Sequence, residues 1–228
     1  MSDTKFSYFE LKGISIRLPQ EILSDRMREA FESGKYESLE ARYMHRILKP
    51  GDRLLELGGG VGFLSALAGK TVELGACTVV EANPLLCEVI TETHRRNGLN
   101  FRVLNSVACP AREDQSSSVP FYLRENFWGS SLDGSRKYRS VTNVARLDLQ
   151  KLIDEFQPTI IICDIEGAEV DLVSEIDFST VDRLYFEIHK AASGIKGIHS
   201  LFLNLLMQGF SYDPDNSVGA VVLFTKIE

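Results

Sequence analysis

Short apolar runs alternate with segments of helical spacing along most of this 228-residue chain. Between the runs, apolar residues recur every three or four positions, as in helices that pack against a sheet. The runs have the length and continuity of buried parallel strands, and they lie at 54–57, 77–80, 101–108, 159–163 and 181–188. This alternation predicts an α/β fold, in which a doubly wound, mostly parallel sheet of seven strands carries helices on both faces.

The first 48 residues do not share this alternation and are expected to form an N-terminal extension. A β-hairpin is predicted over 6–18, and amphipathic helices are predicted over 21–31 and 36–48. No linker-like stretch follows the extension. Residues 1–228 are therefore predicted to form a single domain.

A polar insert at 109–140 interrupts the alternation of strands and helices. It is long for a connection inside a compact domain, which is typical of a functional loop. Strands are expected to flank the loop at 119–124 and 138–146. At the C-terminal end, the pattern predicts two last strands, at 210–212 and 220–226, joined as a hairpin.

The strand at 54–57 runs directly into a glycine-rich turn. Gly58, Gly60 and Gly62 allow a tight turn without side chains in the way, and helical spacing resumes at Phe63. A strand, a glycine turn and a helix N-terminus together bring backbone N–H groups close to a ligand. These three glycines are therefore predicted to bind a cofactor.

The second strand of this unit ends in an acid, Glu81, which is followed by Ala82. An acid at this position can accept both hydroxyls of a ribose. Ser106 lies near the end of the third strand, at the same edge of the sheet. Together with the glycine turn, these residues predict a nucleoside cofactor; without a ligand, the turn would be an ordinary strand–helix connection.

The spacing of the glycines distinguishes between nucleoside cofactors. The dinucleotide fingerprint is G-x-G-x-x-G, whereas Glu56 here begins an E-x-G-x-G-x-G frame. An acid at Glu56 suits a cofactor with a cationic end and would repel a pyrophosphate. S-adenosylmethionine (SAM) carries a sulfonium and an ammonium group, so SAM is the predicted cofactor. An NAD-dependent oxidoreductase on a Rossmann sheet is the alternative.

Other polar residues follow strands at the edge where ligands bind in such sheets. Asp164 comes directly after a buried strand, and Glu187 and His189 lie on the same side of the next one. These three residues are the predicted catalytic groups. Two further acids in the same segment as Asp164, Glu166 and Glu169, are interpreted as helix N-terminal residues stabilised by the helix dipole.

Composition narrows the class of protein further. The net charge of −7 argues against a nucleic-acid partner, because such proteins usually have a basic balance. The four cysteines form no C-x-x-C pair, which favours reduced thiols in a cytoplasmic protein. No apolar stretch reaches the length of a membrane span, and residues 1–5 lack the apolar core of a signal peptide.

Four segments, in this order along the chain, resemble the FkbM family of class I SAM-dependent methyltransferases. They are Glu56–Gly62, Val80–Pro84, Asp164–Glu169 and Glu187–His189. The resemblance covers residues 36–190, and the D-x-E-G-x-E segment at Asp164 is its most specific part. It implies O-methylation of a hydroxyl on a sugar or a secondary metabolite, and therefore a small-molecule or carbohydrate acceptor.

The resemblance also implies a substrate-side loop, because members of the family carry a Gly-Ser-Ser-like stretch there. Trp128, Ser130 and Ser131 are accordingly the predicted substrate-binding residues. Trp128 serves either as an apolar platform for the acceptor or as an anchor for the loop. The chain departs from the family at Ile162, where a lysine is common, so a lysine contact to substrate is not expected. It also reads E-L-G-G-G-V-G where the family often has D-x-G-A-N-x-G.

The expected reaction is direct in-line methyl transfer, with a base that removes the hydroxyl proton of the acceptor. Asp164 or His189 is the candidate base, with Glu187 as the orienting group. Asp164 is also a cofactor candidate, because it could hold the methionine amino group. The three residues could converge on a metal ion, but no ligand spacing requires one and no metal is predicted. A SAM-binding protein without catalysis is a further alternative.

Overall fold

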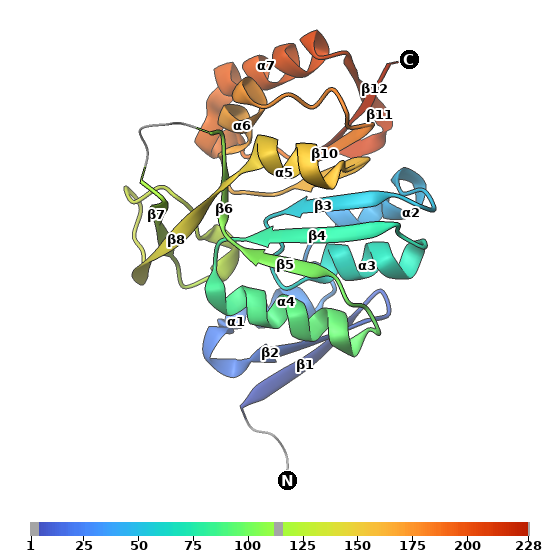
Figure 1. The fold of residues 1–228 in the computed structure, drawn as a ribbon. Coiled ribbons are helices and arrows are strands. Elements are labelled where there is room, and N and C mark those ends of the chain that lie inside the picture. The colour runs from blue at the N-terminus through green and yellow to red at the C-terminus, as the bar shows by residue number, and fades with distance from the viewer. Residues whose placement is uncertain (1–4, 112–115, 228) are drawn as a thin grey trace.

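The computed structural model describes residues 5–111 and 116–227, so the N-terminal stretch 1–4 and part of the polar insert lie outside the described residues. A seven-stranded sheet forms the centre of the molecule, in the order β11-β12-β10-β9-β3-β4-β5 (Figure 1). Its neighbouring strands are parallel except around β12, which runs antiparallel to β10 and β11. The predicted fold class is therefore confirmed. The strands are β3 (Arg53–Leu57), β4 (Ala76–Glu81), β5 (Arg102–Asn105), β9 (Ile160–Cys163), β10 (Arg183–Glu187), β11 (Phe210–Val218) and β12 (Val221–Lys226).

Helices cover both faces of this sheet (Figure 1). Successive strand residues point to opposite faces, so Leu54 joins the core on one side and Leu55 the core on the other. The Leu54 side contains α3 (Phe63–Thr71) and α4 (Pro84–Arg96), and the Leu55 side contains α5 (Leu149–Phe156), α6 (Glu169–Glu175) and α7 (Lys190–Met207).

The N-terminal extension packs outside α4. The predicted hairpin is present as β1 (Phe6–Leu11) and β2 (Ile14–Pro19), and the amide of Ser15 donates to Oδ1 of Asn97 at 3.0 Å. The helix predicted over 21–31 starts later, as α1 (Asp25–Glu32), because Ser24 caps its N-terminus. A short 3₁₀ turn, η1 (Gln20–Ile22), precedes it.

The helix predicted over 36–48 is wrong. The backbone of Glu37 is left-handed, with φ of 44°, and a left-handed residue cannot continue a right-handed helix. The segment forms turns, a 3₁₀ turn η2 (Glu40–Arg42) and one helical turn α2 (Met44–Ile47). Tyr36, Ala41, Met44, Ile47 and Leu48 are nevertheless buried in the core, whereas Leu39 is exposed.

The strand predicted over 101–108 is two strands. The chain leaves the main sheet at Ser106, whose amide donates to the Glu81 carbonyl at 3.1 Å. It then continues as β6 (Val107–Cys109), which pairs in a second sheet of order β6-β8-β7 with β7 (Ser118–Leu123) and β8 (Ser140–Asp148). The arrowheads of β3, β4 and β5 point toward this small sheet (Figure 1), so the polar insert lies at the carboxyl ends of the parallel strands.

At the C-terminal end, residues 213–216, which lie between the two predicted strands, belong to β11. Oδ1 of Asp213 accepts the amides of Asp215 and Asn216, which makes an irregularity in the strand rather than its end. The chain reverses at Gly219, with φ of 61°.

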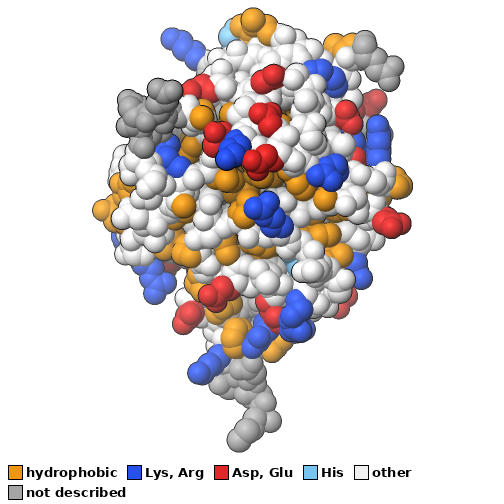
Figure 2. Space-filling model, in the orientation of Figure 1, with side chains coloured by type: hydrophobic (Ala, Val, Ile, Leu, Met, Phe, Trp, Pro, Cys, Tyr) orange, Lys and Arg blue, Asp and Glu red, His pale blue; other side chains and the backbone are white. Residues whose placement is uncertain are grey.

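The surface carries charges of both signs. On the face shown in Figure 2, acidic and basic side chains are interspersed, and apolar side chains show between them across the middle. Within the described residues, none of the helices combines the length and the apolar character that a membrane crossing requires.

Candidate functional site

The glycines after β3 adopt left-handed backbone conformations, with φ of 84° at Gly58, 52° at Gly60 and 77° at Gly62. Gly58 has no room for a side chain, because a Cβ there would lie 1.8 Å from the carbonyl oxygen of Asp164. At Gly60, a Cβ would lie 2.6 Å from Oη of Tyr36. Gly62 packs against α4 instead, so Gly58 and Gly60 are the two of these glycines that line a cavity.

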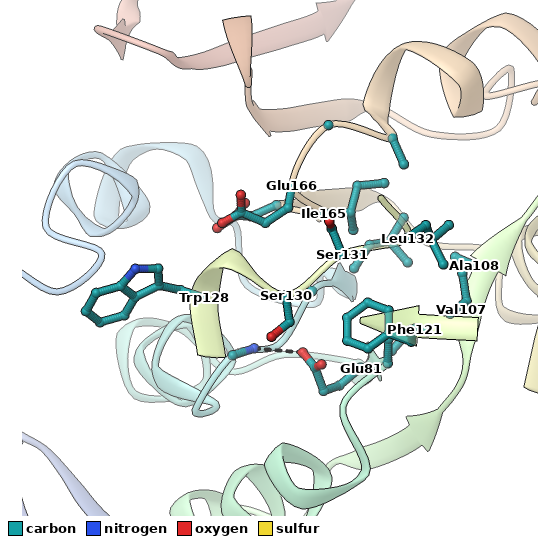
Figure 3. A pocket seen from close by; sticks show the side chains of 18 of the residues that line it. Glu81, Val107, Ala108, Phe121, Trp128, Ser130, Ser131, Leu132, Ile165 and Glu166 are labelled. Atoms are coloured by element: carbon teal, nitrogen blue, oxygen red, sulfur yellow. Dashed lines mark hydrogen bonds between the residues drawn. The ribbon is translucent and has the colours of Figure 1, made fainter. Parts of the chain in front are cut away.

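Glu81 is fixed at the end of β4 by two backbone amides. Its Oε2 accepts the amide hydrogen of Gly60 at 3.1 Å (Figure 3), and its Oε1 accepts that of Asn83 at 2.7 Å. Burial raises the pKa of the Glu81 carboxyl to about 7, and these hydrogen bonds oppose the rise. Because each carboxylate oxygen has a second acceptor site, Glu81 can still accept two hydroxyl donors.

A cavity of about 310 Å³ opens between the glycine turn and the small sheet; it is called here the cofactor cavity. Its size is within the range of small-molecule sites. Glu81, Ala82 and Ser106 lie along it, as does Asp164. The small sheet contributes an apolar wall, formed by Val107, Ala108 and Phe121 (Figure 3).

Glu56 does not line this cavity. The side chain is buried, with 1% of its surface exposed, and its Oε2 has no hydrogen-bond partner among the described residues. Burial raises the pKa of the Glu56 carboxyl to about 8. The structure therefore separates Glu56 from the other predicted cofactor residues, because its side chain faces α3, where it hydrogen-bonds to Ser65.

The loop of the polar insert closes one side of the cofactor cavity. Ser130 and Ser131 are buried on its wall, and the side chain of Arg124 donates to Oγ of Ser131 at 2.8 Å. Trp128 belongs to a 3₁₀ turn, η3 (Phe127–Gly129), and its ring lies 6.2 Å from that of Tyr36. The three predicted substrate residues thus share a cavity with Glu81.

A second cavity, of about 420 Å³, adjoins the first and is called here the acceptor cavity. Glu187 and His189 line it, at the end of β10 and just after it. The two cavities share five lining residues, which are Tyr36, Glu37, Trp128, Asp164 and Glu166. The residues predicted for cofactor and for catalysis therefore meet at Asp164.

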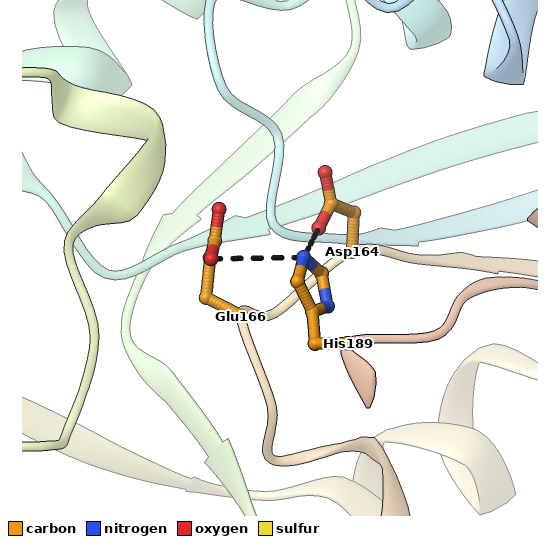
Figure 4. A group of neighbouring side chains, drawn as sticks. All are labelled: Asp164, Glu166 and His189. Atoms are coloured by element: carbon orange, nitrogen blue, oxygen red, sulfur yellow. Dashed lines mark ion pairs between the residues drawn. The ribbon is translucent and has the colours of Figure 1, made fainter. Parts of the chain in front are cut away.

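Four carboxylates surround the imidazole of His189. Its Nδ1 lies 2.9 Å from Oε1 of Glu169. Its Nε2 lies 3.6 Å from Oδ1 of Asp164 and 3.6 Å from Oε2 of Glu166 (Figure 4), and 3.8 Å from Oε2 of Glu187. Glu166 and Glu169 are thus more than helix N-terminal acids, because both contact the candidate catalytic histidine.

These neighbours set the charge of His189. Burial lowers the pKa of the imidazole, but the hydrogen bond to Glu169 and the charges of Asp164 and Glu166 outweigh it and raise the pKa to about 9. These carboxylates therefore favour the protonated imidazole, which has no free lone pair. Burial and the charge of Glu187 raise the pKa of Asp164, and the charge of His189 opposes this rise.

The same cluster could hold a metal ion. Within the described residues, Asp164, Glu166 and His189 offer ligand atoms that all lie within 4.8 Å of one another. Oxygen and imidazole ligands of this kind suit divalent cations. Glu166 takes part in this set, whereas Glu187 was the third group considered from the sequence.

The N-terminal extension also contributes to the site, which the sequence reasoning missed. Tyr36 and Glu37 line both cavities, and the acceptor cavity is lined in addition by Ala30, Lys35, Ser38, Leu39 and Glu40. The ring of Tyr36 stacks on Phe31, with ring centroids 4.3 Å apart, and its hydroxyl faces Gly60. The helical spacing of the segment concealed the left-handed break at Glu37. An aromatic residue followed by an acid is not a sequence motif for any binding site, so Tyr36 and Glu37 could not be identified from the sequence.

No family model and no curated protein matches this chain. Solved structures match its fold. A candidate SAM-dependent methyltransferase from Streptococcus mutans has 11% identity and a TM-score of 0.53, over 99% of this chain and 56% of its own. SMU.776, a candidate methyltransferase complexed with SAH, has 10% identity and a TM-score of 0.51, and the match covers 99% of this chain and 56% of that one. Trm5b from Pyrococcus abyssi has 12% identity and a TM-score of 0.50, and the match covers 96% of this chain and 54% of that one.

The chain spans little more than half the length of these three structures. At identities this low, the likeness concerns the fold alone, and function has to be argued from the site. The strand order and the matches together identify the class I methyltransferase fold.

Proposed function

We propose that this protein is a SAM-dependent O-methyltransferase that acts on a hydroxyl of a sugar or a secondary metabolite. One observation carries the proposal: two cavities meet at Asp164, one ending at Glu81 and the other at His189 and its carboxylates. A nucleoside and a second reactant can thus lie side by side at one carboxylate. Methyl transfer needs this arrangement, because its main requirement is in-line positioning of two reactants.

The residues of the cofactor cavity fit SAM. Glu81 retains an acceptor site on each oxygen for the two ribose hydroxyls. The apolar wall at Val107, Ala108 and Phe121 suits a flat adenine ring. Gly60 leaves open the space that a Cβ would fill beside Tyr36. When bound, SAM supplies an electrophilic methyl group on its sulfonium.

Asp164 is the proposed general base. Its side chain lines both cavities, and its Oδ1 has no hydrogen-bond partner among the described residues, so the carboxylate can accept the hydroxyl proton of the acceptor. The acceptor oxygen then forms its bond to the methyl carbon as the bond from that carbon to sulfur breaks. The imidazolium of His189, 3.6 Å from Asp164, stabilises the carboxylate form of the base. Glu169, hydrogen-bonded to Nδ1, orients His189 in place of Glu187, which lies 3.8 Å from Nε2.

The acceptor cavity supports a small hydroxylated acceptor. Its carboxylates at Glu166 and Glu187 can accept hydrogen bonds from sugar hydroxyls, and they would repel the phosphates of a nucleic acid. The ring of Trp128 offers an apolar platform beside them. The D-x-E-G-x-E segment at Asp164 supports a place within the FkbM family, whose members methylate such hydroxyls.

The proposal is tested by incubating the protein with methyl-labelled SAM and a panel of glycans, phenols and small acids. We expect label transfer to a hydroxylated member of the panel, and about 10²–10⁴-fold less transfer with Asp164→Asn. NADH titration is the matched test of the oxidoreductase alternative. Binding of NADH but not of SAM would overturn the proposal, and SAM binding without transfer to any acceptor would favour a non-catalytic binding protein.

A further inference from the structure

Glu37 is a half-buried acid for which the proposed reaction provides no role so far. It lies in the turn between α1 and η2, and its backbone is left-handed, with φ of 44°. A non-glycine residue in this region is strained and persists only where the surrounding structure enforces it. Strain of this kind is often found at ligand sites.

The carboxylate of Glu37 is incompletely paired. Its Oε2 is buried and has no hydrogen-bond partner among the described residues, while the hydroxyl of Tyr36 hydrogen-bonds to the carboxylate. The negative charges of Glu56, Glu40 and Glu187 also act on it and raise its pKa. A buried carboxylate oxygen beside such charges is stabilised by a proton or a cation.

The position of Glu37 relative to the glycine turn indicates which cation. A Cβ on Gly60 would lie 3.0 Å from Oε1 of Glu37, and the amide of the same Gly60 is bound to Glu81. Gly60 therefore lies between two carboxylates. One of them, Glu81, suits the ribose, and Glu37 lies on the other side of Gly60, where both cavities meet.

We propose that Glu37 binds the α-ammonium group at the methionine end of SAM, a role that rests on the proposed function. The three N–H donors of an ammonium group can satisfy the free Oε2 and still reach a second acceptor. Glu56, the acid predicted for the cationic end, is buried away from the cavity. Glu37 takes over that role from outside the glycine motif.

Two ligands separate this role from a structural one. S-adenosylhomocysteine carries the ammonium group, whereas 5′-methylthioadenosine keeps the adenosine and the sulfur but lacks the amino-acid end. By calorimetry, Glu37→Gln should bind S-adenosylhomocysteine roughly 10- to 100-fold more weakly than the wild type, the loss expected for a charged hydrogen bond. Its affinity for 5′-methylthioadenosine should stay within about twofold, because that ligand does not reach Glu37.

Glu56→Gln is the matched comparison, since Glu56 is another acid near the turn with a buried carboxylate oxygen that has no hydrogen-bond partner among the described residues. It should keep its affinity for both ligands, and thermal unfolding of both variants checks that they fold. Equal weakening of both ligands by Glu37→Gln, or no weakening of either, would overturn the assignment. A selective loss with Glu56→Gln would move the ammonium site to Glu56. If the wild type binds neither ligand, the proposed function fails instead.

Discussion

Nδ1 of His189 lies 2.9 Å from Oε1 of Glu169, although one residue follows β10 and the other begins α6. Glu169 is almost fully buried, with 1% of its surface exposed, and its Oε1 also accepts the amide of Gly167 at 3.1 Å. The pair fixes the orientation of the imidazole, so that Nε2 faces Asp164 and Glu166.

The first prediction concerns the base. The surrounding carboxylates favour the protonated form of His189, so Asp164 is the proposed proton acceptor, and Asp164→Asn should lower turnover about 10²–10⁴-fold. Its affinity for S-adenosylhomocysteine should change by less than about threefold, or about 0.7 kcal/mol. Single-turnover rates with labelled SAM measure the effect. A larger loss with His189→Ala than with Asp164→Asn would assign the base to His189.

The second prediction concerns the charge of His189. Glu169 raises the pKa of the imidazole through its hydrogen bond and its charge, so Glu169→Gln should lower that pKa from about 9 toward the ordinary value of about 6.5. NMR titration of the imidazole, with a chelator present, measures the shift. Glu155→Gln is a matched control on an exposed helix surface. An unchanged His189 pKa in Glu169→Gln would exclude Glu169 as its main partner.

The third prediction concerns Gly60. Gly60→Val should abolish SAM binding, because its Cβ would lie 2.6 Å from Oη of Tyr36 and would occupy the cofactor cavity. Gly98→Ala is the control, since Gly98 is also left-handed but has open space around it. Gly98→Ala should lower the free energy of unfolding by about 1 kcal/mol through backbone strain, and its affinity for SAM should be unchanged. Calorimetry compares the SAM affinities of the two variants, and thermal unfolding compares their stabilities. SAM binding by Gly60→Val would show that Gly60 does not line the cofactor site.

The fourth prediction concerns Glu81 and pH. Two ribose hydroxyls donate to the ionised carboxylate, so Glu81→Ala should weaken binding of 5′-methylthioadenosine by about 1–3 kcal/mol. The pKa of Glu81 is about 7, and below it the carboxyl must lose a proton before binding. Affinity should therefore rise with pH up to about 7 and level off above it. A pH-independent affinity in the wild type would contradict the role given to Glu81.

The fifth prediction concerns stability and Glu56. The folded-state pKa of Glu56 is raised from 4.5 to about 8 by burial, so the native state holds its proton more tightly than the unfolded state. The contribution of Glu56 to stability is then lost as pH rises from about 4.5 to 8, by about 1.4 kcal/mol for each unit of pKa difference. Glu56→Gln removes this titration. Its stability relative to wild type should be greater at pH 8 than at pH 5, as urea unfolding would show, and an equal difference at both pH values would contradict the shift.

Local patterns were sufficient for the sheet and the glycine turn. The run Leu54–Leu57, the glycines after it and Glu81 form one strand–turn–helix–strand unit, whose conformation depends on neighbours in sequence. Glu81 lies beside Gly60 because parallel strands end at a common edge. The sequence was therefore enough to predict the fold class and to place Glu81 at the same edge of the sheet as the glycine turn.

Long-range contacts account for what the sequence did not predict. The apolar residues after Tyr36 are spaced as in a helix, but burial of its ring against Phe31 and the left-handed backbone of Glu37 favour turns. Glu169 has the position of a helix N-terminal acid, and its partner His189 is 20 residues away. The direction of the Glu56 side chain depends on how α3 packs against β3, and the local sequence does not predict that packing.

Trp128 is the single tryptophan of the chain, and it lies where the two cavities meet. Indole fluorescence of the whole protein therefore comes from one position, next to both proposed reactants. Occupancy of either cavity changes the polarity around that ring, so emission intensity and wavelength can follow cofactor and acceptor separately, in real time and without a label. The protein thus contains an optical reporter at the point where its two ligands would meet.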